Sequence, residues 1–191
     1  MNSTFVSKLR SAQSDASEWG VYISPRVEDL PFEIQRHDDP FLPYMRAIHA
    51  ATNDLVCAYV FDLGAYLALG AAGMVALERS IALVRQDRIA VLDAVFATDS
   101  YEEVWGETGY NVDAVTIAAC APPRASHTRP DRQAYVDSED HRFSARYARR
   151  KGELTTTDSM IRLLPLDTLY RARSLSFVDT LRETVVPYVN D

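Results

Sequence analysis

Four short apolar runs stand out along the first part of the chain. They are residues 20–24 (GVYIS), 55–61 (LVCAYVF), 89–95 (IAVLDAV) and 113–119 (DAVTIAA). Each run is nearly continuously apolar instead of alternating with polar residues, which is typical of parallel strands buried on both faces. The pattern therefore predicts four strands at the centre of an α/β sheet.

Between these runs, apolar residues recur at the spacing of an α-helix. Asp39 followed by Pro40 predicts a helix start, with the aspartate as N-cap and the proline at the first helical position. The apolar stripes of two predicted helices are Phe41, Met45, Ile48 and Thr52, and Met74, Leu77, Ile81 and Val84. Residues 99–109 predict a shorter acidic helix. This alternation of strands and helices indicates a parallel sheet with right-handed crossovers.

The chain changes character after the two prolines at 122 and 123. From residue 124 to residue 160 only 10 of 37 residues are apolar, so this stretch is not expected to supply buried strands at the earlier rate. It contains the basic run SARYARRK at 144–151, which we interpret as a solvated helix and loops, with an anion-binding patch as the alternative.

Helical order is expected to return near the end of the chain. Ser176 can cap a helix whose apolar stripe is Val178, Leu181, Val185 and Val189. The predicted organisation is an α/β unit at 1–123, a polar basic segment at 124–160 and a helical segment at 161–191.

Composition narrows the class of protein. The chain has 191 residues, 47% of them hydrophobic and 25% charged, as in an ordinary globular domain. No run approaches the ~18 apolar residues that a membrane span needs, and the polar start lacks a secretion-signal core, so we expect a cytoplasmic protein without membrane contact. A net charge of −7 argues against nucleic-acid binding. Cys57 and Cys120 lie within apolar runs and are expected to be free thiols.

Four longer blocks surround the predicted strands. They are FVSKLRSAQSDASEWGVYISPRVEDLP, LVCAYVFDLGAYLALGAAGMVALE, IAVLDAVFATD and DAVTIAACAPP, and they span roughly residues 5–123. In order and spacing they resemble the orotidine 5′-phosphate decarboxylases of the longer bacterial type. The corresponding family signatures run approximately C-V-G-L-D-P-R, D-L-V-C-A-Y-K-P-N, L-D-A-K-R-x-D-I and A-D-A-V-T-V-N-P.

The resemblance implies that these blocks are the first four strands of a (β/α)8 barrel. A full barrel usually needs about 200 residues or more. The expected fold class is therefore α/β, a partial or shortened (β/α)8 (TIM) barrel with parallel strands. Half a barrel would leave two sheet edges open, and open edges invite pairing with another chain.

The family works without a cofactor and uses an alternating array of Asp and Lys at the strand ends. At the first strand, Ser24 stands where the resemblance places the aspartate that holds the ribose. At the second strand, Val60 stands in place of the lysine of Y-K-P-N and Asp62 in place of the asparagine. The second strand has thus lost its cation.

The third strand has also lost most of the array. Asp93 matches the first aspartate, but Val95 replaces the proton-donating lysine and Thr98 replaces the second aspartate. Decarboxylation leaves a carbanion that a nearby cation must stabilise and an acid must protonate, and valine can do neither. Lys8 and Lys151 are the two lysines of the chain, and neither lies in a matching strand. The resemblance therefore predicts a catalytically degenerate member, a pseudoenzyme.

The phosphate-binding residues of the family also have no clear counterpart in this chain. They consist of a glycine-rich loop near the seventh strand and an arginine after the eighth. The last glycine of this chain is Gly152, so no glycine-rich loop follows it. Arg171 or Arg173 in YRARSLSF bears a weak likeness to the terminal arginine.

Acidic residues near the strand ends are the remaining candidates for chemistry. The candidate catalytic residues are Asp62, Asp93 and Asp99, which could relay a proton or hold a divalent cation, although solvated or inherited acids are the favoured interpretation. The candidate substrate-binding residues are Ser24, Thr98 and Arg173. The four histidines lack metal-ligand spacing, so no metal site is predicted, and the resemblance implies no cofactor.

Two classes of function follow. The favoured one is a non-catalytic binding or assembly module that forms a homodimer or a heteromer with a related chain, since family members are typically dimers. The other is a divergent enzyme of the lyase or hydrolase type that uses Asp62, Asp93 and Asp99 on a pyrimidine nucleotide or a related sugar phosphate.

Overall fold

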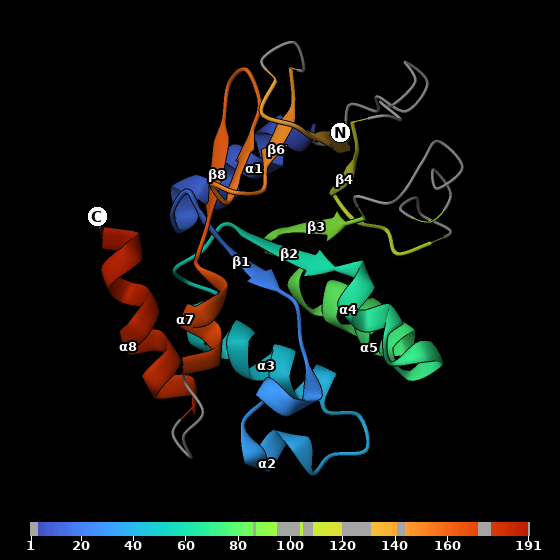
Figure 1. The fold of residues 1–191 in the computed structure, drawn as a ribbon. Coiled ribbons are helices and arrows are strands. Elements are labelled where there is room, and N and C mark those ends of the chain that lie inside the picture. Colours follow the sequence, from blue (N-terminus) through green and yellow to red (C-terminus); the bar gives the residue numbers. More distant parts are fainter. Residues whose placement is uncertain are drawn as a thin grey trace.

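The computed structural model describes residues 4–85, 87–94, 104, 109–119, 131–140, 144–171 and 177–190. Within these residues, eight strands form a closed barrel in sequence order (Figure 1). The strands are β1 (Trp19–Ile23), β2 (Ala58–Asp62), β3 (Ile89–Asp93), β4 (Ala114–Ala118), β5 (Gln133–Asp137), β6 (Arg146–Ala148), β7 (Glu153–Thr155) and β8 (Met160–Leu163). The shortened barrel expected from the sequence is confirmed.

One of the eight described strands runs in the opposite direction to its neighbours. Neighbours from β1 to β6 are parallel, and β8 closes the ring by pairing in parallel with β1. Strand β7 is antiparallel to both β6 and β8. As a result, tight turns and not helices connect β6 to β7 and β7 to β8, and the last three strands occupy few residues.

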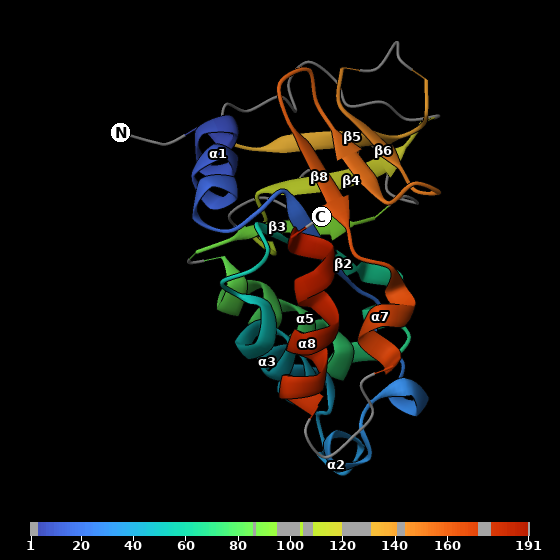
Figure 2. The same cartoon turned by 90° about the vertical axis from the view of Figure 1, so that its left-hand side faces the viewer.

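The helices lie mainly on one side of the barrel. They are α1 (Phe5–Asp15), α2 (Phe32–Gln35), α3 (Phe41–Thr52), α4 (Leu63–Leu67), α5 (Gly70–Val84), α7 (Leu166–Arg171) and α8 (Phe177–Asn190), with a short 3-10 turn at Val27–Asp29. Figure 2 shows α3, α5 and α8 grouped together and away from β5 and β6. None of the helices in the described part of the chain is long and apolar enough to span a membrane.

Alternating side chains of the strands build two apolar clusters. In β2, Tyr59 and Phe61 belong to the outer cluster, which includes side chains of α3, α5 and α8. Ala58 and Val60 of the same strand belong to the inner cluster, which fills the barrel. Because successive strand residues point to opposite faces, one continuously apolar strand serves both clusters.

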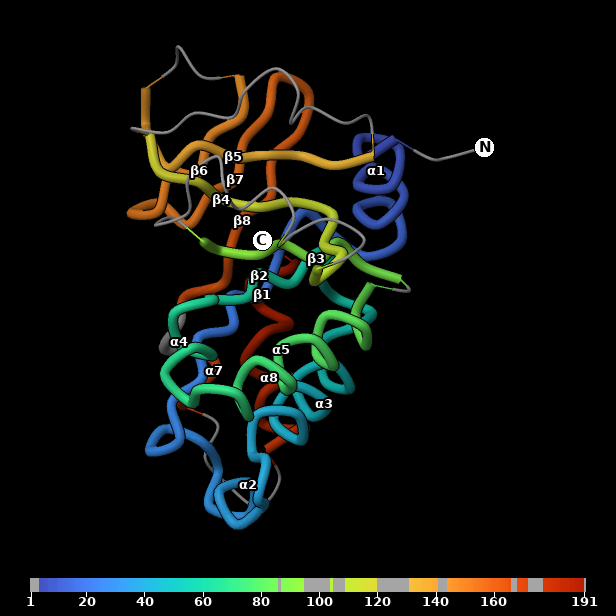
Figure 3. Tube along the Cα trace, turned by 90° about the vertical axis from the view of Figure 1, so that its right-hand side faces the viewer, coloured from blue at the N-terminus to red at the C-terminus, as the bar shows by residue number. Residues whose placement is uncertain are grey.

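Helix α1 closes one end of the barrel (Figure 3). Leu9 is fully buried in the inner cluster, beside Phe5. Lys8 Nζ lies 2.7 Å from a carboxylate oxygen of Asp113, just before β4, and Gln13 donates to the carbonyl of Met160 at the start of β8. These contacts place α1 at the amino-terminal ends of the strands, which leaves the carboxyl-terminal end as the open mouth.

The predicted elements of the first part of the chain are confirmed with small shifts. The four apolar runs form β1 to β4, and the two apolar stripes lie on α3 and α5. The N-cap position of α3 is Pro40 and not Asp39, although the Asp39 carboxylate still accepts a bond from the Leu42 amide at 3.4 Å. The helix predicted at 99–109 and the cap at Ser176 lie outside the described residues.

The interpretation of residues 144–151 as a solvated helix and loops is wrong, because this run contains β6. More generally, the polar stretch at 124–160 contributes β5, β6, β7 and the first residue of β8. In β6, β7 and β8, inward apolar residues such as Tyr147, Leu154 and Ile161 alternate with outward polar residues such as Arg146, Glu153 and Arg162. In β5, Tyr135 points inward and Val136 packs in the outer cluster. The expected open sheet edges are also wrong, since β8 pairs with β1.

Candidate functional site

The mouth of the barrel gathers polar side chains from several strands. Ser24 follows β1, Asp62 ends β2 and Asp93 ends β3, and each continues the inward-facing alternation of its strand. Asp62 and Asp93 are paired in register across β2 and β3. The turn at residues 149–152 between β6 and β7 lies at the same end, because β6 runs parallel to β5.

Asp93 is a buried carboxylate with three donors. Its side chain is 2% exposed. The Tyr22 hydroxyl donates to one oxygen at 2.5 Å and the Thr116 hydroxyl donates to the other. Arg149 Nη2 lies 3.0 Å and 3.2 Å from the two oxygens, which forms an ion pair across the barrel. Each carboxylate oxygen is therefore already hydrogen-bonded within the protein.

Burial dominates the electrostatics of this cluster. It raises the pKa of Asp93, and the bonds from Thr116 and Tyr22 and the charge of Arg149 only partly offset the rise. Burial and the neighbouring Asp93 raise the pKa of the Tyr22 phenol. Burial alone lowers the pKa of Arg149, but the attraction of Asp93 together with that of Tyr147, Tyr22 and Asp137 outweighs burial, and the net shift is upward. Tyr22 and Arg149 thus remain proton donors at neutral pH.

Asp62 has a local structural role beside this cluster. One of its oxygens accepts the Ser24 hydroxyl at 2.8 Å. The other accepts the backbone N–H groups of Gly64 and Ala65 at 2.9 Å and 3.3 Å, so that Asp62 is the N-cap of α4. An aspartate at this position supplies partners for amides that a helix start leaves free.

A cavity of about 540 Å³ opens above the cluster, and we call it the mouth cavity. Its lining consists of Tyr22, Ser24, Arg26, Asp62, Tyr147, Arg149, Arg150, Lys151, Gly152, Leu163, Leu164 and Pro165. Four cationic side chains and one carboxylate face it. Asp93 does not line it and lies beneath Arg149 and Tyr22.

The turn between β6 and β7 brings three of these cations together. Lys151 and Gly152 donate backbone bonds to the carbonyls of Ala148 and Arg149, at 3.0 Å and 3.2 Å. Gly152 has a φ of +65°, which glycine adopts without strain. Among the described residues, no carboxylate lies within ion-pair distance of Arg150 or Lys151, so their charges face solvent and the cavity.

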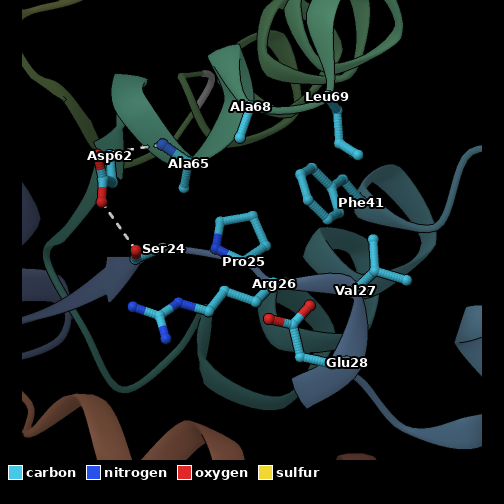
Figure 4. A pocket seen from close by; sticks show the side chains of 10 residues that line it. All are labelled: Ser24, Pro25, Arg26, Val27, Glu28, Phe41, Asp62, Ala65, Ala68 and Leu69. Carbon is cyan, nitrogen blue, oxygen red and sulfur yellow. Dashed lines mark hydrogen bonds between the residues drawn. The ribbon is translucent and has the colours of Figure 1, made fainter.

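A second cavity of about 400 Å³ lies beside the first, and we call it the side cavity. Its lining consists of Ser24, Pro25, Arg26, Val27, Glu28, Phe41, Asp62, Ala65, Ala68 and Leu69. Figure 4 shows Ser24 and Asp62 hydrogen-bonded at one edge and Phe41 and Leu69 at the other, with Pro25 between them.

The outcome for the sequence-predicted residues is mixed. The structure brings Ser24, Asp62 and Asp93 to one end of the barrel. Thr98, Asp99 and Arg173 lie outside the described residues, as does Val95. Val60 is fully buried in the inner cluster. Within the described residues, no group of three or more potential metal ligands is present.

Sequence reasoning missed the residues that surround Asp93. Tyr22 and Thr116 were part of apolar runs, where nothing marked them as polar partners. Arg149 lies in the basic run at 144–151, so that run was the available signal. Its pairing with Asp93 depends on closure of the barrel, which brings β6 across from β3.

Comparison with known proteins identifies the relatives of this chain. The orotidine 5′-phosphate decarboxylase of Herpetosiphon aurantiacus is 31% identical over 125 residues, which cover 60% of this chain and 45% of that protein. The enzyme of the same name from Thermomicrobium roseum is 40% identical over 72 residues, or 38% of this chain and 26% of that protein. The chain is a relative of the orotidine 5′-phosphate decarboxylases. No family model matches it.

Solved structures of decarboxylases share the fold. A putative orotidine-monophosphate decarboxylase from Toxoplasma gondii superposes with a TM-score of 0.59 at 21% identity, covering 87% of this chain and 57% of that one. A putative orotidine 5′-phosphate decarboxylase from Streptomyces avermitilis gives 0.57 at 20% identity, with 70% and 52% covered. At these identities the likeness concerns the fold alone. The chain spans less than half the length of the curated decarboxylases that it matches.

Proposed function

We propose that this decarboxylase relative is a non-catalytic binding module that holds a small anion in the mouth cavity. The observation that carries the proposal is the environment of Asp93. This carboxylate is bonded by Tyr22, Thr116 and Arg149 and does not line the cavity. It therefore forms an ion pair with the half-exposed Arg149 and is not placed to act on a ligand.

Among the described residues, the cation bonded to Asp93 is Arg149 and not a lysine, and Lys151 lines the mouth cavity from the turn between β6 and β7 without contacting Asp93. Val60 matches a family lysine and contributes only to the apolar interior. Lys8 lies at the opposite end of the barrel, bonded to Asp113. Arg149 occupies the cationic position beside Asp93, but a guanidinium holds its proton too tightly to protonate a carbanion at neutral pH.

The charge of the mouth cavity supports an anionic ligand. Arg26, Arg150 and Lys151 line it in addition to the paired Arg149, while the whole chain carries a net charge of −7. A concentration of cations on an otherwise acidic molecule attracts anions locally. Arginine and lysine together supply several donors suited to phosphate or carboxylate oxygens. This observation favours the anion-binding interpretation of the basic run.

The activity prediction follows from these replacements. We expect purified protein to convert no orotidine 5′-phosphate to uridine 5′-phosphate, with turnover below about 10⁻³ of a typical enzyme's ~10 s⁻¹. The assay is the absorbance change of the substrate, and an Asp93→Asn preparation made in parallel controls for contaminating host enzyme. Turnover above that limit in the unmodified chain and absent from the variant would contradict the proposal.

Binding is tested separately with inorganic phosphate. We expect phosphate to shift the backbone amide resonances of residues 149–152 in the isotope-labelled protein, and the double variant Arg150→Gln, Lys151→Gln to weaken the response about tenfold. Arg10→Gln on the exposed face of α1 is the matched control, since it removes a cation at the opposite end of the barrel. The double variant removes two charges and the control removes one, so an equal loss per charge removed would mean that binding follows net charge and not this cavity.

A divergent enzyme remains the second candidate. The raised pKa of Asp93 is the observation in its favour, because a protonated carboxyl in contact with Tyr22 could pass a proton toward the cavity. Such a lyase or hydrolase would act on a pyrimidine nucleotide or a related sugar phosphate. Turnover of any such compound that disappears in Asp93→Asn, with phosphate binding intact, would favour this candidate.

A further inference from the structure

The mouth cavity and the side cavity share a wall. Ser24, Arg26 and Asp62 line both of them. Figure 4 shows the Arg26 guanidinium on the same side as Ser24 and Asp62, whereas Phe41 and Leu69 lie on the far side of Pro25. The two cavities therefore meet at a short polar border formed by these three side chains.

The two cavities differ in the balance of their charges: four cations and one carboxylate line the mouth cavity, whereas Arg26, Glu28 and Asp62 are the charged residues of the side cavity. The mouth cavity presents Arg149, Arg150 and Lys151 from the β6–β7 turn. The apolar lining of the side cavity comes from the segment after β1 and from α3, α4 and the residues that join α4 to α5, namely Pro25, Val27, Phe41, Ala65, Ala68 and Leu69. Phe41 is buried and anchored by Tyr66, with ring centroids 5.4 Å apart, so this wall is preformed.

We infer that the two cavities form one bipartite site for a small amphipathic anion. A phosphate-type head binds at Arg26, Arg150 and Lys151, and a flat apolar body lies in the side cavity against Pro25 and Leu69. The inference rests on the proposed anion binding and adds the apolar half of the ligand.

A ligand that matches only one of the two cavities would leave the other without suitable contacts. A fully polar anion would leave the apolar wall in contact with water, and a neutral apolar compound would gain nothing from the cations. Leu69 is 36% exposed and forms part of the rim, so a bound apolar group would remove its surface from water. Binding sites that combine apolar walls with a few placed charged groups are typical of small-molecule cavities.

The test compares inorganic phosphate with phenyl phosphate at pH 8, where both are largely dianionic. We expect phenyl phosphate to bind at least about tenfold more tightly, since burying a ring adds apolar contact. In spectra of the isotope-labelled protein, both probes should shift the amides of residues 149–152. Phenyl phosphate alone should also shift the amides of residues 65–69.

Two variants test whether the tighter binding of phenyl phosphate depends on the side cavity. Leu69 occupies the N-cap position of α5, where asparagine is well tolerated, so Leu69→Asn should fold normally. It should abolish the tighter binding of phenyl phosphate and leave phosphate binding unchanged. Val75→Asn is the matched control, because Val75 is exposed on α5 and lines neither cavity.

The outcomes separate this inference from the proposed function. Equal affinity for the two probes, or equal weakening of both by Leu69→Asn, would overturn the bipartite site while leaving anion binding in place. Failure of both probes to bind at about 10 mM would overturn the anion site and the bipartite site together. Tighter phenyl phosphate binding lost only in Leu69→Asn would support the inference.

Discussion

At the scale of single residues, the pairing of Asp93 with Arg149 explains how a charged group persists inside this barrel. An ionised carboxylate is costly to bury unless opposite charge and hydrogen bonds compensate. Arg149 supplies the charge, and Tyr22 and Thr116 supply the bonds. The carboxylate that the family resemblance marks as catalytic is here part of the interior.

The raised pKa of Asp93 predicts a pH dependence of stability. Folding favours the protonated carboxyl, so the stabilising contribution of Asp93 is complete below its unfolded pKa of about 3.9 and is lost as pH rises through the higher folded pKa. Asparagine does not titrate. The free energy of unfolding of the unmodified chain minus that of Asp93→Asn should therefore fall as pH rises from about 4 and then become constant.

Denaturant unfolding of both proteins at several pH values between 4 and 8 measures this difference. A difference that grows with pH would mean that the donors around Asp93 outweigh its burial, contrary to the pKa direction given above.

Residue-level prediction from the sequence succeeded where a side chain belongs to a strand. Ser24, Asp62 and Asp93 were placed near the mouth because each lies at or near the end of a recognisable apolar run. Arg149 could not be placed, since its partner comes from a strand far away in the sequence. Arg26 was also missed as a cavity-lining residue, although it stands at the position of the arginine in the family signature C-V-G-L-D-P-R.

At the scale of elements, the contact between α4 and α5 depends on one glycine. A Cβ built on Gly73 would lie 1.9 Å from the carbonyl oxygen of Tyr66 and 2.9 Å from the Cβ of Leu69. Any side chain here must push α4 away from α5. Because Ala65 of α4 and the following Ala68 and Leu69 line the side cavity, such a shift would also move one of its walls.

Gly73→Ala should therefore destabilise the protein by about 1–3 kcal/mol or more through overpacking. Gly70→Ala is the comparison: the space around its Cβ is open, but its φ of +61° is unfavourable for alanine and should cost about 1 kcal/mol. Thermal unfolding of the two variants ranks them. A larger loss of stability for Gly70→Ala than for Gly73→Ala would show that the strained backbone conformation costs more than the crowded contact between α4 and α5.

The attachment of α8 combines an apolar and an ionic contact. Leu181 is fully buried, and Arg182 forms two bonds of 2.6 Å to the exposed Asp54 carboxylate. Leu181→Ala should cost about 2–5 kcal/mol, whereas Asp54→Asn should have a far smaller effect because exposed pairs are screened by solvent. Denaturant unfolding measures both, and comparable losses would contradict the apolar explanation.

Elements differed in how well the sequence revealed them. Strands β1 to β4 are buried on both faces and read as continuous apolar runs. Polar residues flank or interrupt the apolar residues in each of the strands β5 to β8, and β6 and β7 are only three residues long. Such short mixed segments carry too little periodic signal to distinguish them from loops.

At the scale of the whole molecule, the closed ring changes the argument for assembly. Pairing through open sheet edges is no longer supported, because β8 meets β1. A homodimer, or a heteromer with a related chain, through the mouth of the barrel stays a prediction. Light scattering at micromolar concentration tests it, and a stable monomer that also fails to bind a related chain would contradict it.

The reversed direction of β7 has a consequence for the order in which the chain folds. Strands β6, β7 and β8 form a meander whose pairings join residues close in sequence, so little chain entropy opposes their early formation. The seam between β1 and β8 joins opposite ends of the sequence, and its register pairs are Trp19 with Arg162 and Gly20 with Leu163. Closure of the ring is thus expected to be the last and slowest step. Until it occurs, both edges of the nascent sheet remain open to chaperones and to other unfinished chains.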